Sequence, residues 1–408
     1  MRTFFFLWCL MAVALTGCER ERESGLEPAH APPPPAATLR FATFNTSLYS
    51  DEDGGILRRL EADDDKARKI AAVIQHLRPD VLLLNEFDYD SEARAAEIFQ
   101  RRYLEEAQSG QTPIRYEHRY LAPVNTGVPS GLDLDNDGRS DGGNDAWGFG
   151  HHPGQYGMLV LSRYPIDAAA ARSFQHFLWK DLPDARRPHQ PDGTPYHSDE
   201  VWMQLRLSSK SHWDVPIATP GGMVHFLVSH PTPPVFDGVE NRNGLRNFDE
   251  IRLWAEYLAE GDRPWLCDDA RQCGGLAQDA RFVLAGDQNA DPFDGDGVPG
   301  SIAQLLTHPR VNAAFVPQAE GGAARALQHR IARKGDTRAH TGDFGSKTGT
   351  LRLDYLLPSR GLTVRDGGIF WPISPPGHVD WAIASDHHLV WLDIEHDSTT
   401  APTQGDTP

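Results

Sequence analysis

Carboxylate, amide and imidazole side chains stand directly after three short apolar runs in this sequence of 408 residues. The residues that follow these runs are Asn85 and Glu86, then His230, then Asp287 and Asn289. Apolar runs of this length are typical of buried strands, and strand ends are where a rigid sheet can aim side chains into one shared pocket. The sequence therefore predicts a single polar site at the ends of several strands.

These residue types suit the hydrolysis of a phosphoester. The negative charge of phosphate repels nucleophiles, and a hard metal ion held by carboxylate and amide oxygens relieves that repulsion. A water must also be positioned or deprotonated, which an imidazole and a carboxylate can do together. Asp287 and Asn289 lie two residues apart, so on an extended segment both side chains point to the same side. One can then orient the attacking water while the other donates a hydrogen bond to a phosphate oxygen.

Between residues 38 and 396, short apolar runs alternate with helical patterns, which predicts two packed sheets with helices outside them. Predicted strands cover 39–45, 81–85, 157–162, 201–207, 224–229, 282–285, 353–357 and 389–394. Predicted helices cover 65–77, 92–107 and 245–259. The sequence contains no evident repeat and no obvious second domain, so we expect one large α/β domain over 38–396.

Several short segments form a series along the chain. In order they are Thr43-Phe44-Asn45, Pro79-Asp80-Val81 through Glu86, Tyr156-Gly157-Met158 leading to Ser162-Arg163-Tyr164-Pro165, Ser229-His230, Gly286-Asp287-Gln288-Asn289, Arg352-Leu353-Asp354-Tyr355 and Ser385-Asp386-His387. The series resembles the endonuclease/exonuclease/phosphatase superfamily, which includes DNase I-like nucleases, neutral sphingomyelinases and inositol polyphosphate phosphatases. Any one segment is weak, but the full series in the family's order is strong.

The resemblance implies a four-layer α/β sandwich of the DNase I-like type, in which two packed mixed sheets are flanked by helices. It also implies an enzyme that hydrolyses phosphoesters with a divalent ion, Mg²⁺ or Mn²⁺. Glu86 is then the best metal ligand, with Asn45 and Asp386 beside it. These expectations concern fold, cofactor and activity together.

The catalytic residues that the resemblance implies are His387, His230, Asp354, Asp287 and Asn289. His387 and Asp354 resemble the family's paired imidazole and carboxylate, in which the acid orients the ring and favours its cation. His230 is a candidate for stabilising the transition state or protonating the leaving oxygen. Which imidazole acts as the general base stays open. Singly, each residue also fits a capping or salt-bridging role at a strand end, but as a set they favour catalysis.

Two positions depart from the usual pattern of the family. Asn85 stands where many relatives carry Gln, which affects the geometry around Glu86 and not the ligand itself. His387 is followed by a second histidine, His388, whose ring we expect to be exposed at a strand end.

A segment rich in basic and aromatic residues precedes residue 214. Its basic members are Lys180, Arg186, Arg187, Lys210 and His212, and its tryptophans are Trp179, Trp202 and Trp213. Such a segment can contact a phosphate-rich ligand. The interpretation that we favour is basic surface side chains lying over core tryptophans.

The composition excludes several classes of protein. Hydrophobic residues make up 39% of the chain and charged residues 24%, which argues against wholesale disorder and against a coiled-coil or collagen-like rod. Lys and Arg number 39 against 57 Asp and Glu, and no run of four basic residues occurs. A protein that holds duplex DNA through its phosphates is therefore not expected, whereas an enzyme that uses a metal to neutralise one phosphate needs no basic surface.

The N-terminal residues 1–17 have the pattern of a bacterial lipoprotein signal peptide. Arg2 precedes an apolar run over 4–14, which is far shorter than the roughly 20 residues of a membrane-spanning helix. Leu15-Thr16-Gly17-Cys18 resembles a lipobox, in which Cys18 receives the lipid anchor. We therefore expect an exported, membrane-tethered protein on the periplasmic or cell-surface side; an ordinary cleaved signal is the alternative.

Two further segments and a cysteine pair complete the organisation. Residues 18–37 end in four prolines and predict an extended linker, and residues 397–408 predict a disordered tail. After Cys9 and Cys18 are set aside, Cys267 and Cys273 remain. In an oxidising compartment they favour a disulfide over a free catalytic thiol.

The insert 123–155 carries an acidic loop. Asp133, Asp135, Asp137 and Asp141 occupy loop positions one, three, five and nine, with Gly138 at the sharp turn. This oxygen-rich spacing is typical of a calcium loop, although no Glu closes it. We favour a structural Ca²⁺ site that orders the insert near the pocket over a solvated acidic turn.

The sequence thus predicts an exported, metal-dependent phosphoester hydrolase, with nuclease or phosphodiesterase action first. The alternative is hydrolysis of phosphomonoesters, or of phospholipid or sphingomyelin phosphodiesters. The substrate would accordingly be nucleic acid, a phosphorylated small molecule or a lipid. The non-enzymatic alternative is a calcium-stabilised surface binding protein on a degenerate scaffold, against which the intact series of acid, amide and imidazole residues speaks.

Overall fold

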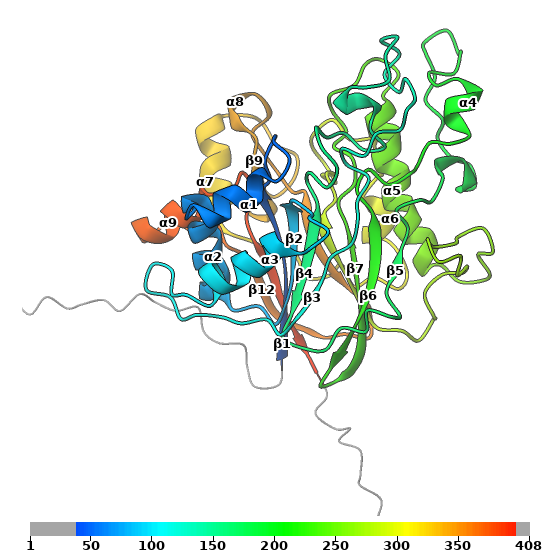
Figure 1. Cartoon of the computed structure of the whole chain (residues 1–408). Helices are drawn as coiled ribbons and strands as arrows, with labels where there is room; N and C mark the ends of the chain where they lie inside the picture. Colours follow the sequence, from blue (N-terminus) through cyan, green and yellow to red (C-terminus); the bar gives the residue numbers. More distant parts are fainter. Residues whose placement is uncertain (1–37, 397–408) are drawn as a thin grey trace, which may run out of the picture.

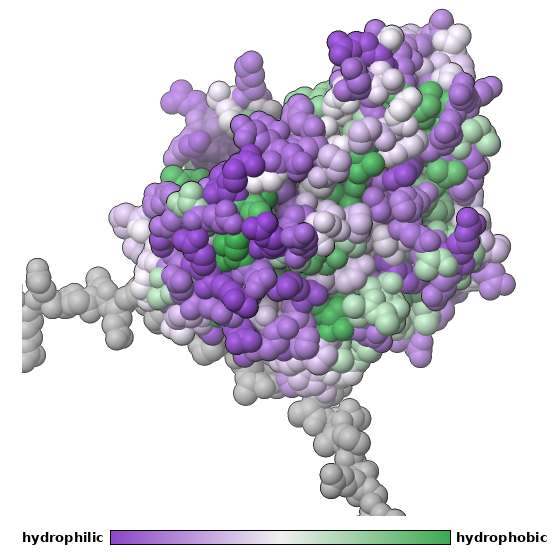
Figure 2. All heavy atoms as spheres, in the orientation of Figure 1, coloured by the Kyte–Doolittle hydropathy of each residue, from purple (hydrophilic) through white to green (hydrophobic). Residues whose placement is uncertain are grey.

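Two large β-sheets form the centre of the computed structural model, which describes residues 38–396 (Figure 1). The predicted signal peptide 1–17, the linker 18–37 with Cys18 and the tail 397–408 lie outside the described residues. Figure 2 shows one face of the molecule, which is mainly hydrophilic with separate apolar patches. No helix within 38–396 combines the length and the apolar character that crossing a bilayer requires.

The first sheet has the strand order β12-β13-β1-β2-β4-β3. Its strands are β1 (Thr38–Leu48), β2 (Val81–Phe87), β3 (His118–Tyr120), β4 (Met158–Ser162), β12 (Val364–Ile369) and β13 (Val390–Glu395). β1 and β2 are parallel, with Phe41 opposite Val81 and Asn45 opposite Asn85. Their carboxyl ends therefore lie at the same edge of the sheet.

The second sheet has the order β11-β8-β7-β6-β5. Its strands are β5 (Arg172–Ser173), β6 (His212–Thr219), β7 (Gly222–Ser229), β8 (Phe282–Asp287) and β11 (Asp354–Pro358). β7 and β8 are parallel, whereas β8 and β11 are antiparallel with Asp287 opposite Asp354. The ends of β7 and β8 and the start of β11 thus share one edge.

Alternation along the central strands gives each sheet two apolar faces. Phe41 and Leu83 of the first sheet pack with Phe226 of the second in the core between the sheets. Phe44 and Leu84 point the other way, into the core beneath the outer helices. A further core lies between the second sheet and the helix Arg242–Leu258. The predicted four-layer α/β sandwich is confirmed.

Helices cover both outer faces (Figure 1). Those on the first sheet are α1 (Gly55–Glu61), α2 (Asp65–Leu77), α3 (Arg94–Ile98) and α9 (Pro376–Ala382); those on the second are α5 (Arg242–Leu258) and α6 (Ala303–Leu306). The other elements outside the two sheets include α4 (Asp199–Trp202), α7 (Glu320–His329), α8 (Gly345–Thr348), β9 (Gly342–Asp343) and β10 (Thr350–Leu351).

The three predicted helices are all present. The helix over 65–77 has the predicted bounds and begins where the Asp64 side chain accepts a hydrogen bond from Ala67 N at 2.8 Å. The one over 92–107 is α3 continued by a π-helix over Phe99–Leu104. The third, α5, begins three residues before the predicted 245.

The predicted strand over 201–207 is wrong. The side chain of Ser198 accepts a hydrogen bond from Val201 N at 3.2 Å, and this cap begins α4. Val201 and Leu205 are buried against α5, which explains the strand-like apolar pattern. The strand in this part of the sheet is β6, in which Trp213, Val215 and Ile217 alternate into the core between the sheets.

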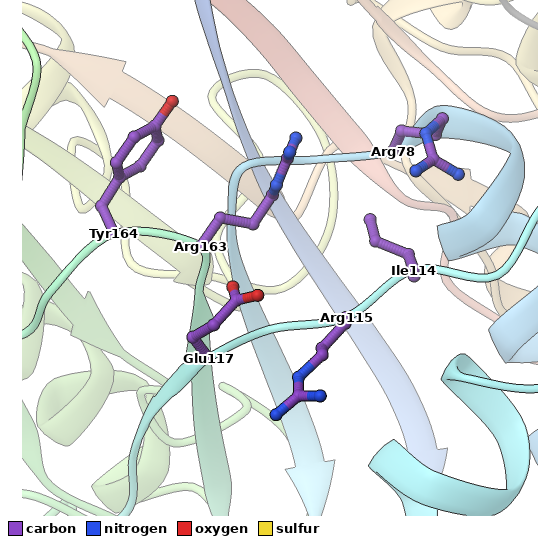
Figure 3. Close-up of a pocket in the computed structure, with 6 residues that line it drawn as sticks. All are labelled: Arg78, Ile114, Arg115, Glu117, Arg163 and Tyr164. Carbon is purple, nitrogen blue, oxygen red and sulfur yellow. The ribbon is translucent and has the colours of Figure 1, made fainter.

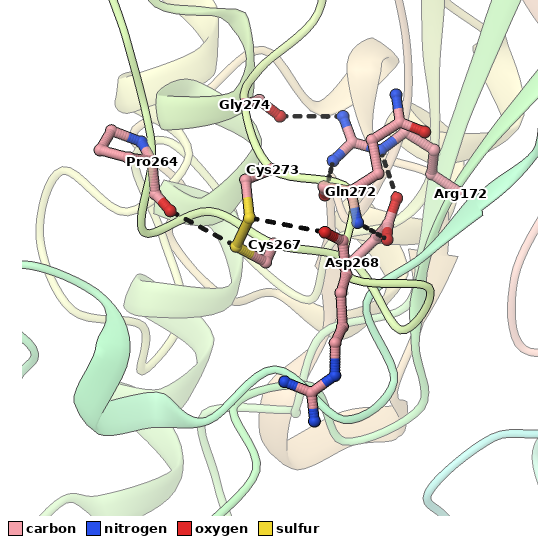
Figure 4. The surroundings of a disulfide bond; sticks show 8 residues. Arg172, Pro264, Cys267, Asp268, Gln272, Cys273 and Gly274 are labelled. Atoms are coloured by element: carbon pink, nitrogen blue, oxygen red, sulfur yellow. Dashed lines mark hydrogen bonds and ion pairs between the residues drawn. A yellow bond between two sulfur atoms is a disulfide. The ribbon is translucent and has the colours of Figure 1, made fainter.

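Cys267 and Cys273 form a disulfide, as predicted (Figure 4). The bridge closes a loop between α5 and β8. Asp268 in this loop pairs with Arg172 of β5 at an N–O distance of 2.6 Å, and Arg172 also donates to Gly274 O at 2.8 Å. The disulfide therefore closes the loop on itself, and the ion pair and hydrogen bonds of Arg172 hold the loop to the edge of the second sheet.

Candidate active site

The amide of Asn45 joins the two sheets at their shared polar edge. Its Nδ2 donates to Glu86 Oε1 at 2.9 Å and to Asp287 Oδ2 at 3.0 Å. Asn45 belongs to β1, Glu86 to β2 and Asp287 to β8. Two residues that lie 41 and 242 positions further along the chain thus meet at one amide. The structure thus brings these three predicted site residues together.

The backbone at these strand ends adopts conformations that favour glycine. Gly286 has φ 138° and lies so close to β7 that a side-chain carbon there would collide with the carbonyl oxygen of Ser229. Glu86 and Asn289 have φ 56° and 50°, values that are uncommon for residues with a side chain. Such conformations cluster at functional sites, where the surrounding structure imposes them.

His387 and Asp354 form the predicted imidazole and carboxylate pair. His387 Nδ1 lies 2.8 Å from Asp354 Oδ2, and His387 Nε2 lies 3.6 Å from Asp287 Oδ2. Thr341 Oγ1 donates to the same Asp354 oxygen at 2.7 Å, which fixes the carboxylate. Burial alone would lower the pKa of His387, but the charges of Asp354 and Asp287 outweigh it and raise the pKa well above its usual value. The ring is therefore held as an imidazolium.

His230 reaches the same centre from the end of β7. Its Nε2 lies 3.3 Å from Asp287 Oδ2 and 3.9 Å from Glu86 Oε1. Burial would raise the pKa of Asp287, but the charges of His387 and His230 leave the pKa of this carboxyl below its usual range. Asp287 is thus an ionised carboxylate between two imidazoles.

The sequence over 42–387 matches the profile of the endonuclease/exonuclease/phosphatase family. The chain belongs to this family. Together with the assembled acid, amide and imidazole groups, this membership makes the protein a metal-dependent phosphohydrolase.

Two solved structures are similar to the chain. An endonuclease/exonuclease/phosphatase protein from Beutenbergia cavernae is 18% identical, covers 88% of this chain and 72% of its own, and has a TM-score of 0.50. Sphingomyelinase C from Streptomyces griseocarneus is 17% identical over 87% of this chain and 99% of its own, with a TM-score of 0.45. No curated protein sequence matches the chain.

The donor groups at the centre of the site fit a divalent cation. Glu86, His230 and Asp287 offer ligand atoms within 4.8 Å of one another, and Asp287, Asp354 and His387 form a second such group. The oxygen-rich character of this set suits a hard ion. Of the predicted metal ligands, Glu86 belongs to the first group. Asn45 directs its nitrogen toward Glu86, so ligation by its oxygen requires the amide to turn over.

Asp386, the third predicted ligand, lines the same cavity as Glu86. Its Oδ1 accepts a hydrogen bond from Ser47 Oγ at 3.1 Å. Asn289 also lines the cavity, and its Nδ2 donates to Pro231 O at 3.1 Å. All eight residues predicted for the catalytic centre thus lie around one polar edge, with Asp354 buried behind His387.

The cavity at this edge has a volume of about 950 Å³. Its acidic wall residues include Glu86, Asp135, Asp287, Asp291, Asp294, Asp296 and Asp386. Its basic wall residues, besides His197, His230 and His387, are Lys210, Arg242 and Arg246. Phe149, Phe236 and Phe344 contribute aromatic surface.

A smaller cavity of about 390 Å³ lies at the opposite end of the first sheet (Figure 3). Its walls include Arg78, Arg115, Glu117 and Arg163. Arg163 is already paired with Asp80 at 3.0 Å. None of the carboxylate and imidazole groups described above lies here, so this cavity is not the catalytic centre.

Several residues of the site were not predicted. Thr341 holds Asp354, and Ser385 Oγ donates to Asn45 O at 2.8 Å. Glu250 of α5 accepts from Ser209 N and Thr232 N, both at 2.6 Å, and so fixes the segments beside His230. A hydroxyl or a helical acid gives no local signal for such a role, because the partners come from distant parts of the chain.

The acidic insert forms a different cluster from the predicted one. Asp133 and Asp135 gather with Asp145, within 4.8 Å of one another. Asp141 instead pairs with Arg139 at 3.0 Å, and Asp137 accepts a hydrogen bond from Arg139 N. Neither Asp137 nor Asp141 belongs to the cluster.

The expected exposure of His388 is wrong. Its side chain is buried and stacks on Trp371 with ring centroids 3.7 Å apart. Burial and the charge of His387 lower the pKa of His388 to about 3, so this ring is neutral. Its backbone N donates to Thr341 O at 2.8 Å, which places it among the structural supports of the site.

Proposed function

We propose that the protein hydrolyses phosphodiesters with a divalent ion, Mg²⁺ or Mn²⁺, held by Glu86 together with Asn45 and Asp386. The observation that carries this proposal is the convergence of His230 and His387 on the Asp287 carboxylate, which shares the amide of Asn45 with Glu86. The ion would supply charge neutralisation at the phosphate when bound.

The side chains divide the remaining work between them. Asp287, kept ionised, is the acceptor for a proton of the attacking water. His387, held as a cation by Asp354, donates a hydrogen bond to a phosphoryl oxygen where negative charge grows. His230 is the candidate that protonates the leaving oxygen.

Extracytoplasmic nuclease or phosphodiesterase action is the first assignment. A polynucleotide carries a negative charge on every linkage. Seven carboxylates against three Lys and Arg line the cavity, so the wall by itself does not neutralise that charge. Cleavage of a diester therefore depends on the metal rather than on a basic channel.

Hydrolysis of an amphiphilic phosphodiester, such as a phospholipid or sphingomyelin, is the second assignment. Phe149 and Phe236 line the cavity and are 51% and 86% exposed. Phe236 also has φ 65°, which is unusual for a bulky residue. Exposed aromatic surface at a pocket mouth suits an apolar substrate group.

Turnover assays decide between these assignments. DNA, RNA, sphingomyelin, and p-nitrophenyl phosphodiester and monoester substrates are tested with Mg²⁺ and with EDTA. We expect metal-dependent diester cleavage by the wild type, its loss in Glu86→Gln, and wild-type rates in the control Glu117→Gln, an exposed carboxylate at the opposite end of the first sheet. Monoester cleavage alone, or metal-independent cleavage, would contradict the proposal.

Lipid anchoring at Cys18 and export are further parts of the proposal, and they rest on the lipobox pattern. Expression in a bacterium with labelled palmitate should label the wild type in the membrane fraction. Cys18→Ala should remove the label and release the protein from that fraction. Unchanged labelling of the variant would contradict the anchor.

Calcium binding by the insert is proposed for Asp133 and Asp135 with Asp145. Asp135 and Asn144 line the mouth of the large cavity, so an ion here would order the insert beside the site. Calorimetry should show Ca²⁺ uptake that Asp133→Ala combined with Asp135→Ala abolishes. Absence of Ca²⁺ uptake by the wild type, or the same uptake by the variant, would contradict calcium binding by the insert.

A further inference from the structure

Lys210 is a buried cation on the wall of the catalytic cavity. It precedes β6 by two residues and is 6% exposed. Within 38–396 the structure gives its ammonium group no hydrogen bond and no ion pair. A buried charge without a partner is costly, so its presence beside a substrate cavity requires an explanation.

The other basic side chains of the cavity wall already have partners. The guanidinium of Arg246 donates to Leu207 O at 2.8 Å and to Trp147 O at 2.6 Å. Arg242 pairs with Glu240. Lys210 is therefore the one Lys or Arg of the described cavity wall whose charge is uncommitted.

The fold holds Lys210 beside the catalytic centre. β6 and β7 are antiparallel with His212 opposite Ser229, so the segment before β6 runs alongside the one that carries His230. Ser209 Oγ donates to His230 O at 3.4 Å. Glu250 binds the backbone on both sides, at Ser209 N and Thr232 N. The position of Lys210 relative to His230 is thus fixed by three hydrogen bonds.

The electrostatic surroundings agree with this placement. Burial lowers the pKa of Lys210, and the charges of Glu250, Glu86 and Asp287 act against that effect. The carboxylates of Glu250 and Asp287 both have other partners. Glu250 accepts from backbone amides, and Asp287 pairs with imidazoles. The ammonium therefore faces the cavity with its donors free.

We propose that Lys210 binds the substrate phosphate, donating to the non-bridging oxygen that the metal does not hold. This inference rests on the proposed function. A phosphodiester carries one negative charge shared by its two non-bridging oxygens, and further charge develops on them as water attacks, so a cation beside each oxygen stabilises the transition state. Lys210 then supplies phosphate affinity at a site whose wall is otherwise mostly acidic.

Phosphorothioate diesters test this contact. The p-nitrophenyl diester that the wild type hydrolyses fastest is made as its Rp and Sp phosphorothioates, which replace one non-bridging oxygen at a time. In the wild type we expect one diastereomer to be rescued when Mn²⁺ replaces Mg²⁺ and the other to stay slow. In Lys210→Gln the slow diastereomer should be hydrolysed at nearly the rate of the oxygen diester, because the contact is already gone.

We also expect Lys210→Gln to lose about ten- to a hundredfold in kcat/KM, the size of a charge-assisted hydrogen bond, and Lys210→Arg to recover part of it. Lys334→Gln, which removes an exposed Lys outside the cavity, should behave as the wild type. Retention of both thio effects in Lys210→Gln would overturn the contact, even with lowered activity, because it would mean a structural role. No diester hydrolysis by the wild type would instead overturn the proposed function.

Discussion

Two buried histidines, one before β13 of the first sheet and one at the start of β6 of the second, have opposite charge states. His387 lies at the catalytic edge between Asp354 and Asp287, and its pKa is raised well above the usual value. His212 begins β6, where Nδ1 lies 2.6 Å from Ser208 Oγ and Nε2 lies 2.9 Å from Glu250 O. Burial lowers the pKa of His212 to about 4. Both residues are buried, so the two carboxylates that lie within 4 Å of the His387 ring, and not burial, decide the difference in charge.

The comparison separates chemistry from support. A protonated ring among carboxylates can donate to a developing negative charge. A neutral ring bonded to a hydroxyl and a carbonyl can only join structural elements, in this case β6 and α5. Changes at His387 should therefore affect turnover, and changes at His212 should affect stability.

The largest expected effect on activity is at His387. His387→Ala should lower kcat on a phosphodiester by about 10³-fold, the range of a general acid–base or electrostatic group. Its unfolding temperature should also fall, because Asp354 is left buried without its cation, so kcat is compared at a temperature where the variant is folded. Stopped assays and circular dichroism melts measure the two quantities. Wild-type kcat in this variant would show that the ring takes no part.

Asp354→Asn should have a smaller effect, of about a hundredfold in kcat. The substitution keeps the shape but removes the charge that holds the His387 proton. The ring of the variant should accordingly titrate at lower pH, which NMR of the His387 resonance detects. An unchanged titration would mean that Asp354 does not set the charge of His387.

His212→Ala should leave the kcat of the folded enzyme within about twofold of the wild type and lower its stability. Removal of two buried hydrogen bonds and of the ring volume should cost about 2–4 kcal/mol of unfolding free energy. Denaturant titration measures this cost. A variant of wild-type stability but low kcat would reverse the roles assigned to the two histidines.

The smallest effect concerns the pH dependence of stability. The pKa of His212 in the folded protein, about 4, lies below the ordinary pKa of a histidine, about 6.5, so the unfolded chain binds the extra proton. The stability that this ring contributes is present above pH 6.5 and is lost as the pH falls toward 4. Melts between these limits should show a shallower acid loss in His212→Asn than in the wild type. Equal slopes would contradict the neutral state of the ring.

The sequence predicted that these polar side chains would lie together, because the strands before them carry unbroken apolar runs. Glu86, His230 and Asp287 each follow such a run, and parallel neighbours bring these ends to one edge. The four-layer fold followed from the same pattern together with the family resemblance. β6 was missed although Trp213, Val215 and Ile217 alternate along it, because Pro216 lies in the same run and proline is unusual inside a strand.

The remaining errors have tertiary causes. Asp145 joins Asp133 and Asp135 through a bend of the insert that loop spacing does not reveal. His388 is buried because Trp371 stacks on it from a different segment. Lys210 was grouped with surface residues, since no local pattern shows that a lysine before a strand will face a cavity.

Glu86, Asp287 and His387 are proposed to act together in one metal-assisted hydrolysis of a phosphodiester. The most direct test is the release of p-nitrophenol from a phosphodiester by the wild type and by Glu86→Gln, each with Mg²⁺ and with EDTA. We expect the wild type to release p-nitrophenol with Mg²⁺, to stop when EDTA is added and to resume with excess Mg²⁺. The variant should release none. Equal release by Glu86→Gln, or release that EDTA leaves unchanged, would contradict this proposal.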